Sequence, residues 1–274
     1  MNPGEKHTAT LERGEPVAVP HTPTLSIVIP VRNEGLNLRI MLKILPAVVE
    51  VPHEVIVVHD TPGDDSVSTV AELGIEPNRL RAVLNSLGNG VANAIRAGVT
   101  ESCGDYILIF AADEVGPVLA IKEMLQLMDG GCDFVSCTRY AHGGRRLGGS
   151  WIGGVMSHTA NHLFHWYARS AFTDSTTGVK MFRRELFPSF HLEARNVGWA
   201  VMFEMAIRAQ LLDLELGEVP IISIDRLYGG KSTFKLGPWV VEYLRWFLWG
   251  AKELRRASGR PRACRLAGVG QLGR

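Results

Sequence analysis

Short apolar runs alternate with segments of helical periodicity along the first half of the chain. The runs are rich in Val, Ile and Leu and lack polar alternation, which is typical of strands buried on both faces of a parallel sheet. Strands are predicted at 25–30, 54–58, 81–84, 106–110 and 133–136, and helices at 36–45, 67–73, 91–100 and 117–128. This order of strand then helix predicts a doubly wound α/β fold, with a mostly parallel sheet flanked by helices.

The pattern changes after residue 140. A glycine-rich loop at 143–149 carries Arg145 and Arg146 and precedes a long amphipathic stretch at 151–167. Further elements are predicted beyond it: a helix at 197–212, a short strand at 217–221 and an aromatic helix at 239–254.

Composition restricts the class of protein. Hydrophobic residues make up 46% and charged residues 21%, so extensive disorder, a collagen-like rod and a coiled coil are excluded. Lys and Arg (29) nearly balance Asp and Glu (28), so nothing in the net charge points to nucleic acid as a partner. The four cysteines form no CxxC pair, which fits a reducing compartment. With neither a secretory signal nor a membrane span in the pattern, we expect a cytoplasmic protein.

Acidic side chains follow three of the predicted strands at the points where they end. Glu34 follows the first strand, Asp60 the second, and Asp113 with Glu114 the fourth. Because parallel strands end at one edge of a sheet, we expect these carboxylates to meet in one crevice. They suit the hydroxyl and N–H groups of a nucleotide, or a divalent cation that bridges its phosphates. The alternative is that Asp60 and Asp113 only cap the helices that follow them.

Blocks of sequence around these strand ends resemble the family-2 glycosyltransferases in order and spacing. Segment 26–34 is similar to the opening of that family, segment 57–66 to its second signature and segment 88–92 to its third. In the second signature an acidic pair is usual, and here only Asp60 matches, since His59 precedes it. The later blocks, at 136–140, 173–180 and 218–232, most resemble the dolichol- or polyprenyl-phosphate sugar synthase branch. The resemblance covers about residues 24–236.

This resemblance implies a GT-A fold and an inverting transfer from a nucleotide-diphosphate sugar. Asp60 would hold the uracil or guanine edge, because a carboxylate accepts two N–H bonds, and Gly90 would let the backbone approach the nucleotide. The residues implied to bind substrate at the strand ends are Pro30, Arg32, Glu34, Asp60, Gly90 and Asp113.

The resemblance also implies a divalent cation, Mg²⁺ or Mn²⁺, but the sequence departs from the family's Asp-x-Asp motif. Ala111 replaces the first aspartate and cannot ligate a cation, so Asp113 and Glu114 are the candidate metal ligands. Mg²⁺ needs few protein ligands because it keeps waters and substrate phosphates. Without an ion, other cations would neutralise the leaving diphosphate, and the candidates are Arg139, Arg226, Lys231 and Lys235.

The expected reaction is displacement at the anomeric carbon of the sugar. A hydroxyl acceptor needs a general base, whereas a phosphate acceptor is already anionic and needs only positioning and desolvation. Asp174 and Glu204 are the candidates for a base or an acceptor-orienting group, and Glu204 has the alternative of a structural carboxylate within a helix. Arg226 is a third catalytic candidate, in a basic glycine loop with Lys231 and Ser232 that would grip phosphates.

The last predicted helix carries an aromatic stripe and precedes a basic tail. Its aromatic residues are Trp239, Tyr243, Trp246, Phe247 and Trp249. Tryptophan favours the membrane boundary and arginine attracts anionic lipid, which indicates a peripheral protein at the inner face of a membrane. The alternative is a helix packed on the main domain or across a homodimer.

We therefore expect a flexible leader at 1–23, a GT-A glycosyltransferase domain at 24–236, an interfacial helix at 237–255 and a disordered basic tail at 256–274. The favoured acceptor is a polyprenyl- or dolichyl-phosphate-type lipid. The alternatives are transfer to a saccharide hydroxyl in surface-polysaccharide assembly and a non-catalytic nucleotide-sugar-binding relative.

Overall fold

A computed structural model describes residues 24–114, 116–148, 151–224, 236–257 and 262–266. Its strands are β1 (Leu25–Val31), β2 (His53–His59), β3 (Leu80–Leu84), β4 (Tyr106–Ile109), β5 (Phe134–Thr138), β6 (Arg145–Leu147), β7 (Lys180–Arg183), β8 (Leu216–Pro220), β9 (Ile222–Ile224) and β10 (Ala263–Cys264). Its α-helices are α1 (Gly35–Val48), α2 (Asp65–Glu72), α3 (Val91–Thr100), α4 (Ile121–Asp129), α5 (Trp151–Ala168), α6 (Ala200–Leu211) and α7 (Leu236–Arg256). Two 3₁₀ helices, η1 (Gly116–Ala120) and η2 (Arg184–Phe190), complete the described elements.

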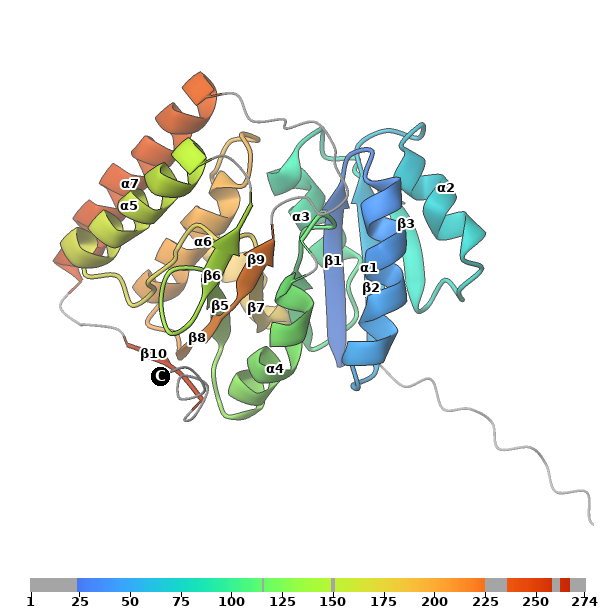
Figure 1. Ribbon diagram of the computed structural model, residues 1–274, viewed down its shortest axis with the longest axis horizontal. Helices are drawn as coiled ribbons and strands as arrows, with labels where there is room; N and C mark the ends of the chain where they lie inside the picture. The colour runs from blue at the N-terminus through green and yellow to red at the C-terminus, as the bar shows by residue number, and fades with distance from the viewer. Residues whose placement is uncertain (1–23, 115, 149–150, 225–235, 258–261, 267–274) are drawn as a thin grey trace, which may run out of the picture.

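Eight strands form one central sheet in the order β10-β8-β5-β7-β4-β1-β2-β3 (Figure 1). Every pairing is parallel except those of β7, which runs antiparallel to both β4 and β5. Strands β1 and β2 are in register to their last residues, since Val31 pairs with His59. The segments that follow β1, β2 and β4 therefore leave the sheet at the same edge.

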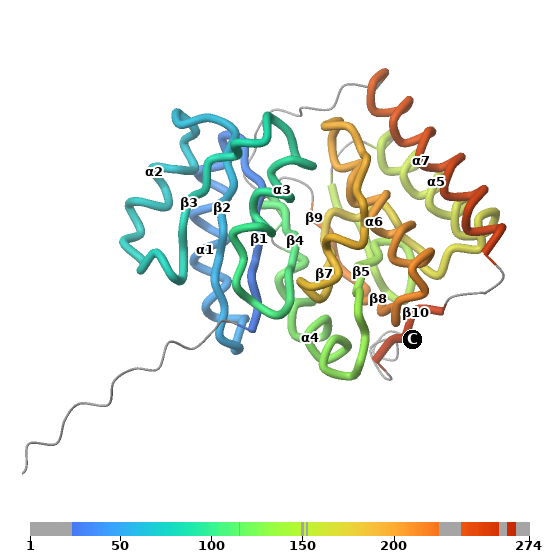
Figure 2. The backbone as a smooth tube through the Cα atoms, turned by 180° about the vertical axis from the view of Figure 1, so that it is seen from behind, coloured from blue at the N-terminus to red at the C-terminus, as the bar shows by residue number. Residues whose placement is uncertain are grey.

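Strand β1 shows why the apolar runs lack alternation. Leu25, Ile27 and Ile29 belong to one buried cluster, whereas Val28 belongs to a second cluster on the opposite face of the sheet. Helices α1 and α4 cover the first face, and α3 and α6 cover the second (Figures 1 and 2). A strand with helices on both sides must be apolar at every position, so the parallel-sheet prediction is confirmed.

Helices α5 and α7 lie side by side beyond α6 at one end of the molecule (Figures 1 and 2). Trp246 of α7 is buried against the domain, and its indole N–H donates to Glu242 Oε1 at 3.0 Å. The predicted alternative, in which this helix packs on the main domain, therefore accounts for its inner face. None of the helices in the described ranges combines the length and the apolar character that a bilayer span requires.

Four features differ from the sequence prediction. The predicted glycine-rich loop contains a short strand, β6, which pairs with a second unpredicted strand, β9. Strand β7 was not predicted, because its run of four residues is short and begins with a lysine. The predicted helix at 117–128 is a 3₁₀ turn, η1, followed by α4. In the tail predicted to be disordered, β10 pairs with the edge strand β8, so that prediction is wrong for Ala263–Cys264.

Candidate active site

The turn after β1 is fixed by the turn after β2. The backbone N–H of Asn33 donates to Asp64 Oδ2 at 2.9 Å, and that of Gly35 donates to Asp65 Oδ1 at 2.9 Å. Asp64 also caps α2 by accepting from the N–H of Ser66 at 2.9 Å. These carboxylates satisfy donors at the start of α1 that would otherwise need water. They place the 30–34 segment firmly at the sheet edge, where Arg32 is exposed and Pro30 and Glu34 are half-buried.

Asp60 joins the loops after β2 and β3 to the start of α3. Its Oδ1 accepts from Asn85 Nδ2 at 2.8 Å, and its Oδ2 accepts from the N–H of Gly90 at 3.0 Å. The side chain is half-buried. The carboxylate thus links the loops after β2 and β3 to the start of α3. It does not cap α2, the helix that follows it in the chain, because Asp64 caps that helix.

Position 90 requires glycine for two reasons: its backbone conformation and its close contact with a residue that is distant in the sequence. Its φ is +120°, and a Cβ built there would lie 2.5 Å from the Cβ of Asn196. Asn196 Oδ1 accepts from the N–H of Asn93 at 3.2 Å, so it caps α3 from a loop that lies far along the chain. Approach of a nucleotide to Gly90 stays a prediction, while the close approach of Asn196 is a second reason for glycine.

Asp113 and Glu114 follow β4, which pairs in parallel with β1. Both are half-buried, and Glu114 Oε1 accepts from Ser223 Oγ of β9 at 3.3 Å. Across the described ranges, no group of three or more Asp, Glu, His or Cys side chains is arranged to hold a metal ion. Two adjacent carboxylates fit a cation that draws its remaining ligands from water and a diphosphate, and Ala111 adds none.

Asp174 forms a buried ion pair with Arg139 at the end of β5. Arg139 Nε donates to Asp174 Oδ2 at 2.7 Å and Arg139 Nη2 donates to Oδ1 at 3.0 Å. Burial alone would raise the pKa of Asp174, but the guanidinium outweighs it and holds that pKa below its usual value. With no exposed surface and both oxygens occupied, Asp174 is a fixed anion.

Two further buried groups support this pair. Glu218 of β8 accepts from the N–H of Thr173 at 2.7 Å and from its hydroxyl at 3.0 Å, which fixes the loop that carries Asp174. Burial raises the pKa of Glu218. Lys180 Nζ donates to Ser136 Oγ at 2.9 Å, and burial lowers the pKa of Lys180 to about 8. These groups form a polar layer within the sheet, under the strand ends.

Glu204 holds the loop that precedes α6. Its carboxylate accepts from the N–H groups of Glu193 and Ala194, each at 2.7 Å, and from Arg208 Nε at 2.7 Å. The side chain is fully buried, and burial raises its pKa. These contacts favour the structural alternative for Glu204, because no carboxylate oxygen reaches the surface. The same loop continues to Asn196, so Glu204 acts on the sheet edge indirectly.

The structure thus gathers most of the predicted residues and leaves some aside. Pro30 lies near the end of β1, and the residues that follow the neighbouring parallel strands at the same edge are Arg32, Glu34, Asp60, Gly90, Asp113 and Glu114. In the adjoining half of the sheet, Arg139 follows β5 and Asp174 lies in the loop between α5 and β7. Arg226, Lys231, Ser232 and Lys235 lie outside the described residues, so their roles stay predictions.

Three positioning residues were absent from the predicted site: Asp64, Asn85 and Asn196. The Asp-Asp-Ser run at 64–66 is a recognisable N-cap signal for α2. Asn196 had no local signal, because its partners lie about a hundred residues earlier in the chain.

The mostly parallel sheet, its antiparallel β7 and its carboxylate-bearing edge define a GT-A glycosyltransferase. The solved glucosyl-3-phosphoglycerate synthase from Mycobacterium tuberculosis, in complex with Mn²⁺, uridine diphosphate and glucosyl-3-phosphoglycerate, has this fold. It superposes with a TM-score of 0.63 at 18% identity, with 84% of this chain and 80% of that chain covered. The chain belongs to glycosyl transferase family 2, which matches residues 26–189.

Relatives from curated proteins confirm the predicted branch of the family. The chain is similar to the polyprenol monophosphomannose synthase of Mycolicibacterium smegmatis, with 26% identity over 251 residues that cover 86% of this chain and 94% of that protein. It is also similar to the dolichol-phosphate mannosyltransferase of Mycosarcoma maydis, with 25% identity over 238 residues, 82% of this chain and 80% of that protein. The protein is therefore a glycosyltransferase related to enzymes that act on lipid phosphates.

Proposed function

We propose that this glycosyltransferase moves a sugar, with inversion, from a nucleoside diphosphate to a polyprenyl- or dolichyl-phosphate-type lipid. The observation that carries this choice of acceptor is the enclosure of both candidate bases. Asp174 and Glu204 are fully buried, and each has its oxygens engaged by donors. A saccharide hydroxyl needs a base within reach of its proton, whereas a phosphate oxygen attacks without one. The two curated relatives, named for polyprenol and dolichol substrates, support the same choice.

The surface of α5 and α7 supports a lipid acceptor independently. Each helix buries one side and leaves an apolar stripe exposed, and we call the two stripes together the α5–α7 face. Its large exposed side chains are Trp151, Val155, Met156, Leu163, Trp166, Tyr167, Val240, Val241, Leu244 and Leu248. Trp151 and Trp166 are 80% and 74% exposed, which is costly in water and favourable at the boundary of a bilayer. We propose that the protein lies peripherally on the inner face of a membrane through this face.

The residues of the chain would divide the work of the reaction. Asp60 and the 30–34 segment would bind the nucleoside, and the Arg139–Asp174 pair would orient the loop beside the acceptor. Asp113 and Glu114 would hold Mg²⁺ or Mn²⁺, which when bound supplies positive charge to the leaving diphosphate. Arg226, Lys231 and Lys235 would add to that charge, with Ser232 as a further phosphate contact.

Transfer of label decides between the acceptors. The purified full chain is incubated with radiolabelled UDP- and GDP-sugars and with undecaprenyl phosphate in detergent micelles. The proposal predicts label in an organic-extractable product that depends on the lipid phosphate. A parallel reaction supplies an oligosaccharide mixture in place of the lipid phosphate, and label found only in that water-soluble glycan would favour the alternative of a saccharide hydroxyl and would overturn the lipid acceptor.

Metal dependence is tested on the same reaction. We expect EDTA to abolish turnover and Mn²⁺ to restore it. Replacing Ala111→Asp supplies a third carboxylate and should lower the Mn²⁺ concentration for half-maximal rate by about tenfold, since affinity follows the charge of the ligand set. Full turnover in EDTA would show that side-chain cations alone neutralise the diphosphate.

A homodimer stays a prediction, and light scattering of the purified protein measures it directly.

A further inference from the structure

Two of the four cysteines lie on one face of the sheet, where the C-terminal strand β10 pairs with β8. Cys264 of β10 is in register with Gly217 of β8, and because the two strands are parallel, both positions point to the same face. A Cβ built at Gly217 would lie 3.3 Å from Cys132 Sγ. Since position 217 is glycine, no side chain of β8 stands between Cys132 and Cys264 there.

The packing of the neighbouring residues places Cys264 on this face independently. Ala263 packs against the cluster under α3 and α6, whereas Leu266 packs against the cluster under α1 and α4, to which Cys132 belongs. Side chains alternate between the two faces along a strand, so Cys264 lies on the side of Cys132. Two cysteines from distant parts of the chain thus meet over one strand.

The two thiols differ in exposure. Cys264 is exposed, whereas the side chain of Cys132 is buried, with 5% exposure. Burial raises the pKa of Cys132 to about 11, and the neighbouring Cys264 adds to that rise. An oxidant from the solvent therefore meets Cys264 first, and Cys132 lies behind it as the thiol that completes a disulfide.

We propose that Cys132 and Cys264 form a disulfide when the protein meets a peroxide, and that this bond latches β10 to the sheet. The Cys264 thiolate attacks the peroxide, so an S–O bond forms, the O–O bond breaks, and the leaving hydroxide takes up the proton that Cys264 released. The sulfur of Cys132 then attacks that of Cys264. The S–S bond forms, the S–O bond breaks, and the hydroxyl leaves as water with the proton of Cys132. Two thiols are oxidised while one peroxide is reduced to two waters, and an added dithiol reverses the bond by exchange.

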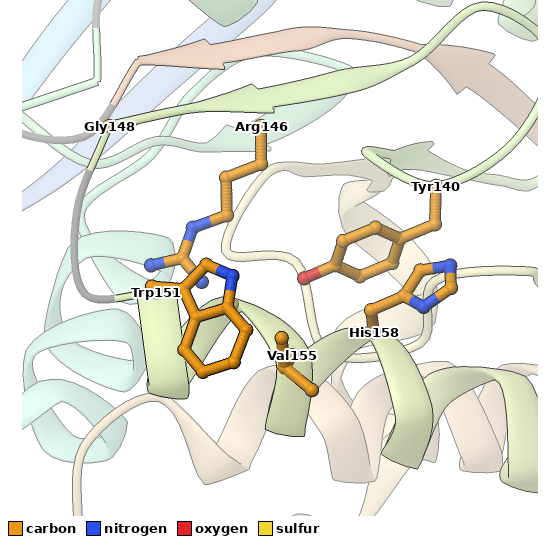
Figure 3. Close-up of a pocket in the computed structure, with 7 residues that line it drawn as sticks. Tyr140, Arg146, Gly148, Trp151, Val155 and His158 are labelled. Carbon is orange, nitrogen blue, oxygen red and sulfur yellow. The ribbon is translucent and has the colours of Figure 1, made fainter.

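The latch acts on a strand that is short without it. β10 has two residues and stands at the end of the sheet order, next to β8, so its pairing alone contributes little stability. The next residue, Arg265, has its Nη1 2.9 Å from His142 Nδ1. His142 lies between Tyr140 and Arg146 in the chain, and both line a pocket of about 360 Å³ at the start of α5 (Figure 3). The disulfide therefore also secures the contact between the C-terminal segment and the loop that leads into this pocket.

Oxidation of the full chain tests the latch. The reduced protein is treated with hydrogen peroxide, the remaining thiols are alkylated, and peptides are mapped by mass spectrometry without reductant. Hydrogen exchange of the 262–266 segment is measured before oxidation, after it, and after dithiothreitol. Cys132→Ala removes the second thiol. Cys103→Ser is the matched control, because Cys103 is also exposed but precedes β4, and β5 and β7 separate β4 from β8.

We expect a peptide that links Cys132 to Cys264 in the wild type and in Cys103→Ser. In Cys132→Ala, Cys264 should instead proceed to sulfinic acid, because no second thiol is there to capture it. Exchange in the 262–266 segment should slow by about tenfold or more on oxidation and recover with dithiothreitol. Three outcomes would overturn the proposal: sulfinic acid at Cys264 in the wild type, a bond from Cys264 to Cys103 or to another molecule, or equal exchange in both redox states. Thermal melting confirms that each variant folds.

Discussion

Asp174 and Arg139 face each other in a two-point ion pair, with N···O distances of 2.7 and 3.0 Å. Such a geometry matches the fork of the guanidinium to both carboxylate oxygens. The side chain of Asp174 is fully buried, and that of Arg139 is nearly so, with 13% exposure. It fixes the loop after β5 against the 173–178 loop.

Removing one charge of this pair should destabilise the fold. Asp174→Asn leaves the Arg139 guanidinium buried without a counter-charge, at a cost of about 3–5 kcal/mol in the free energy of unfolding. Urea denaturation measures the loss. Asp213→Asn is the control, because Asp213 is exposed and asparagine tolerates its φ of +54°. A loss below 1 kcal/mol for Asp174→Asn would contradict the buried pair.

Lys180 should make stability rise with pH above neutrality. Its pKa is lowered by burial to about 8, below the usual 10.5, so the unfolded chain binds more protons between these two values. The free energy of unfolding then increases with pH across that window and is flat below it, at most by about 1.4 kcal/mol per pH unit. Urea titrations at pH 7.5 to 10 measure this slope, and Lys180→Met should reduce it. The exposed Lys122→Met is the control, and an unchanged slope in Lys180→Met would contradict the assignment.

Gly90→Ala should damage both stability and donor binding. The new Cβ would stand 2.5 Å from Asn196 at a φ of +120°, so the loop that caps α3 must move. We expect a loss of about 1–3 kcal/mol in the free energy of unfolding, together with weaker nucleotide-sugar binding. Gly74→Ala separates the effect of backbone strain from that of the contact with Asn196, because Gly74 also has a positive φ but its added Cβ would meet nothing within 4 Å. The account is wrong here if the two variants lose equal stability and both keep donor binding.

The α5–α7 face predicts the membrane behaviour of the protein. The double variant Trp166→Glu/Val241→Glu places charge in both stripes, and it should reduce cosedimentation with phosphatidylglycerol-containing vesicles by about tenfold or more. Activity towards a short soluble phosphate acceptor should remain. Leu119→Glu is the control, since Leu119 is 74% exposed on η1, away from both helices. Equal loss in the control would show that binding is unspecific.

Local patterns were sufficient for the strands β1 to β5 and for the edge at which β1, β2 and β4 end. The all-apolar runs of β1 and β2 specify strands buried on both faces, and the acidic residues that follow them must then share one edge. The partnership of Asp174 with Arg139 was beyond such patterns, because two candidate site residues 35 positions apart prove to satisfy each other. The structural role of Glu204 was also beyond local patterns, because an acidic residue in an apolar helix has the same local sequence whether it faces a substrate or a backbone loop. Strand β7 was missed because its run of four residues is short and begins with a lysine.

The central claim is that a nucleotide sugar binds at the edge where β1, β2 and β4 end. A thermal-shift panel of nucleotide sugars with Mn²⁺ tests it, run on the wild type, on Asp60→Asn and on Asp105→Asn, whose exposed carboxylate precedes β4 at the opposite edge. The account predicts one donor that raises the melting temperature of the wild type and of Asp105→Asn by about 3 °C or more, with little rise for Asp60→Asn. A full rise in Asp60→Asn, or no rise with any donor in the wild type, would contradict it.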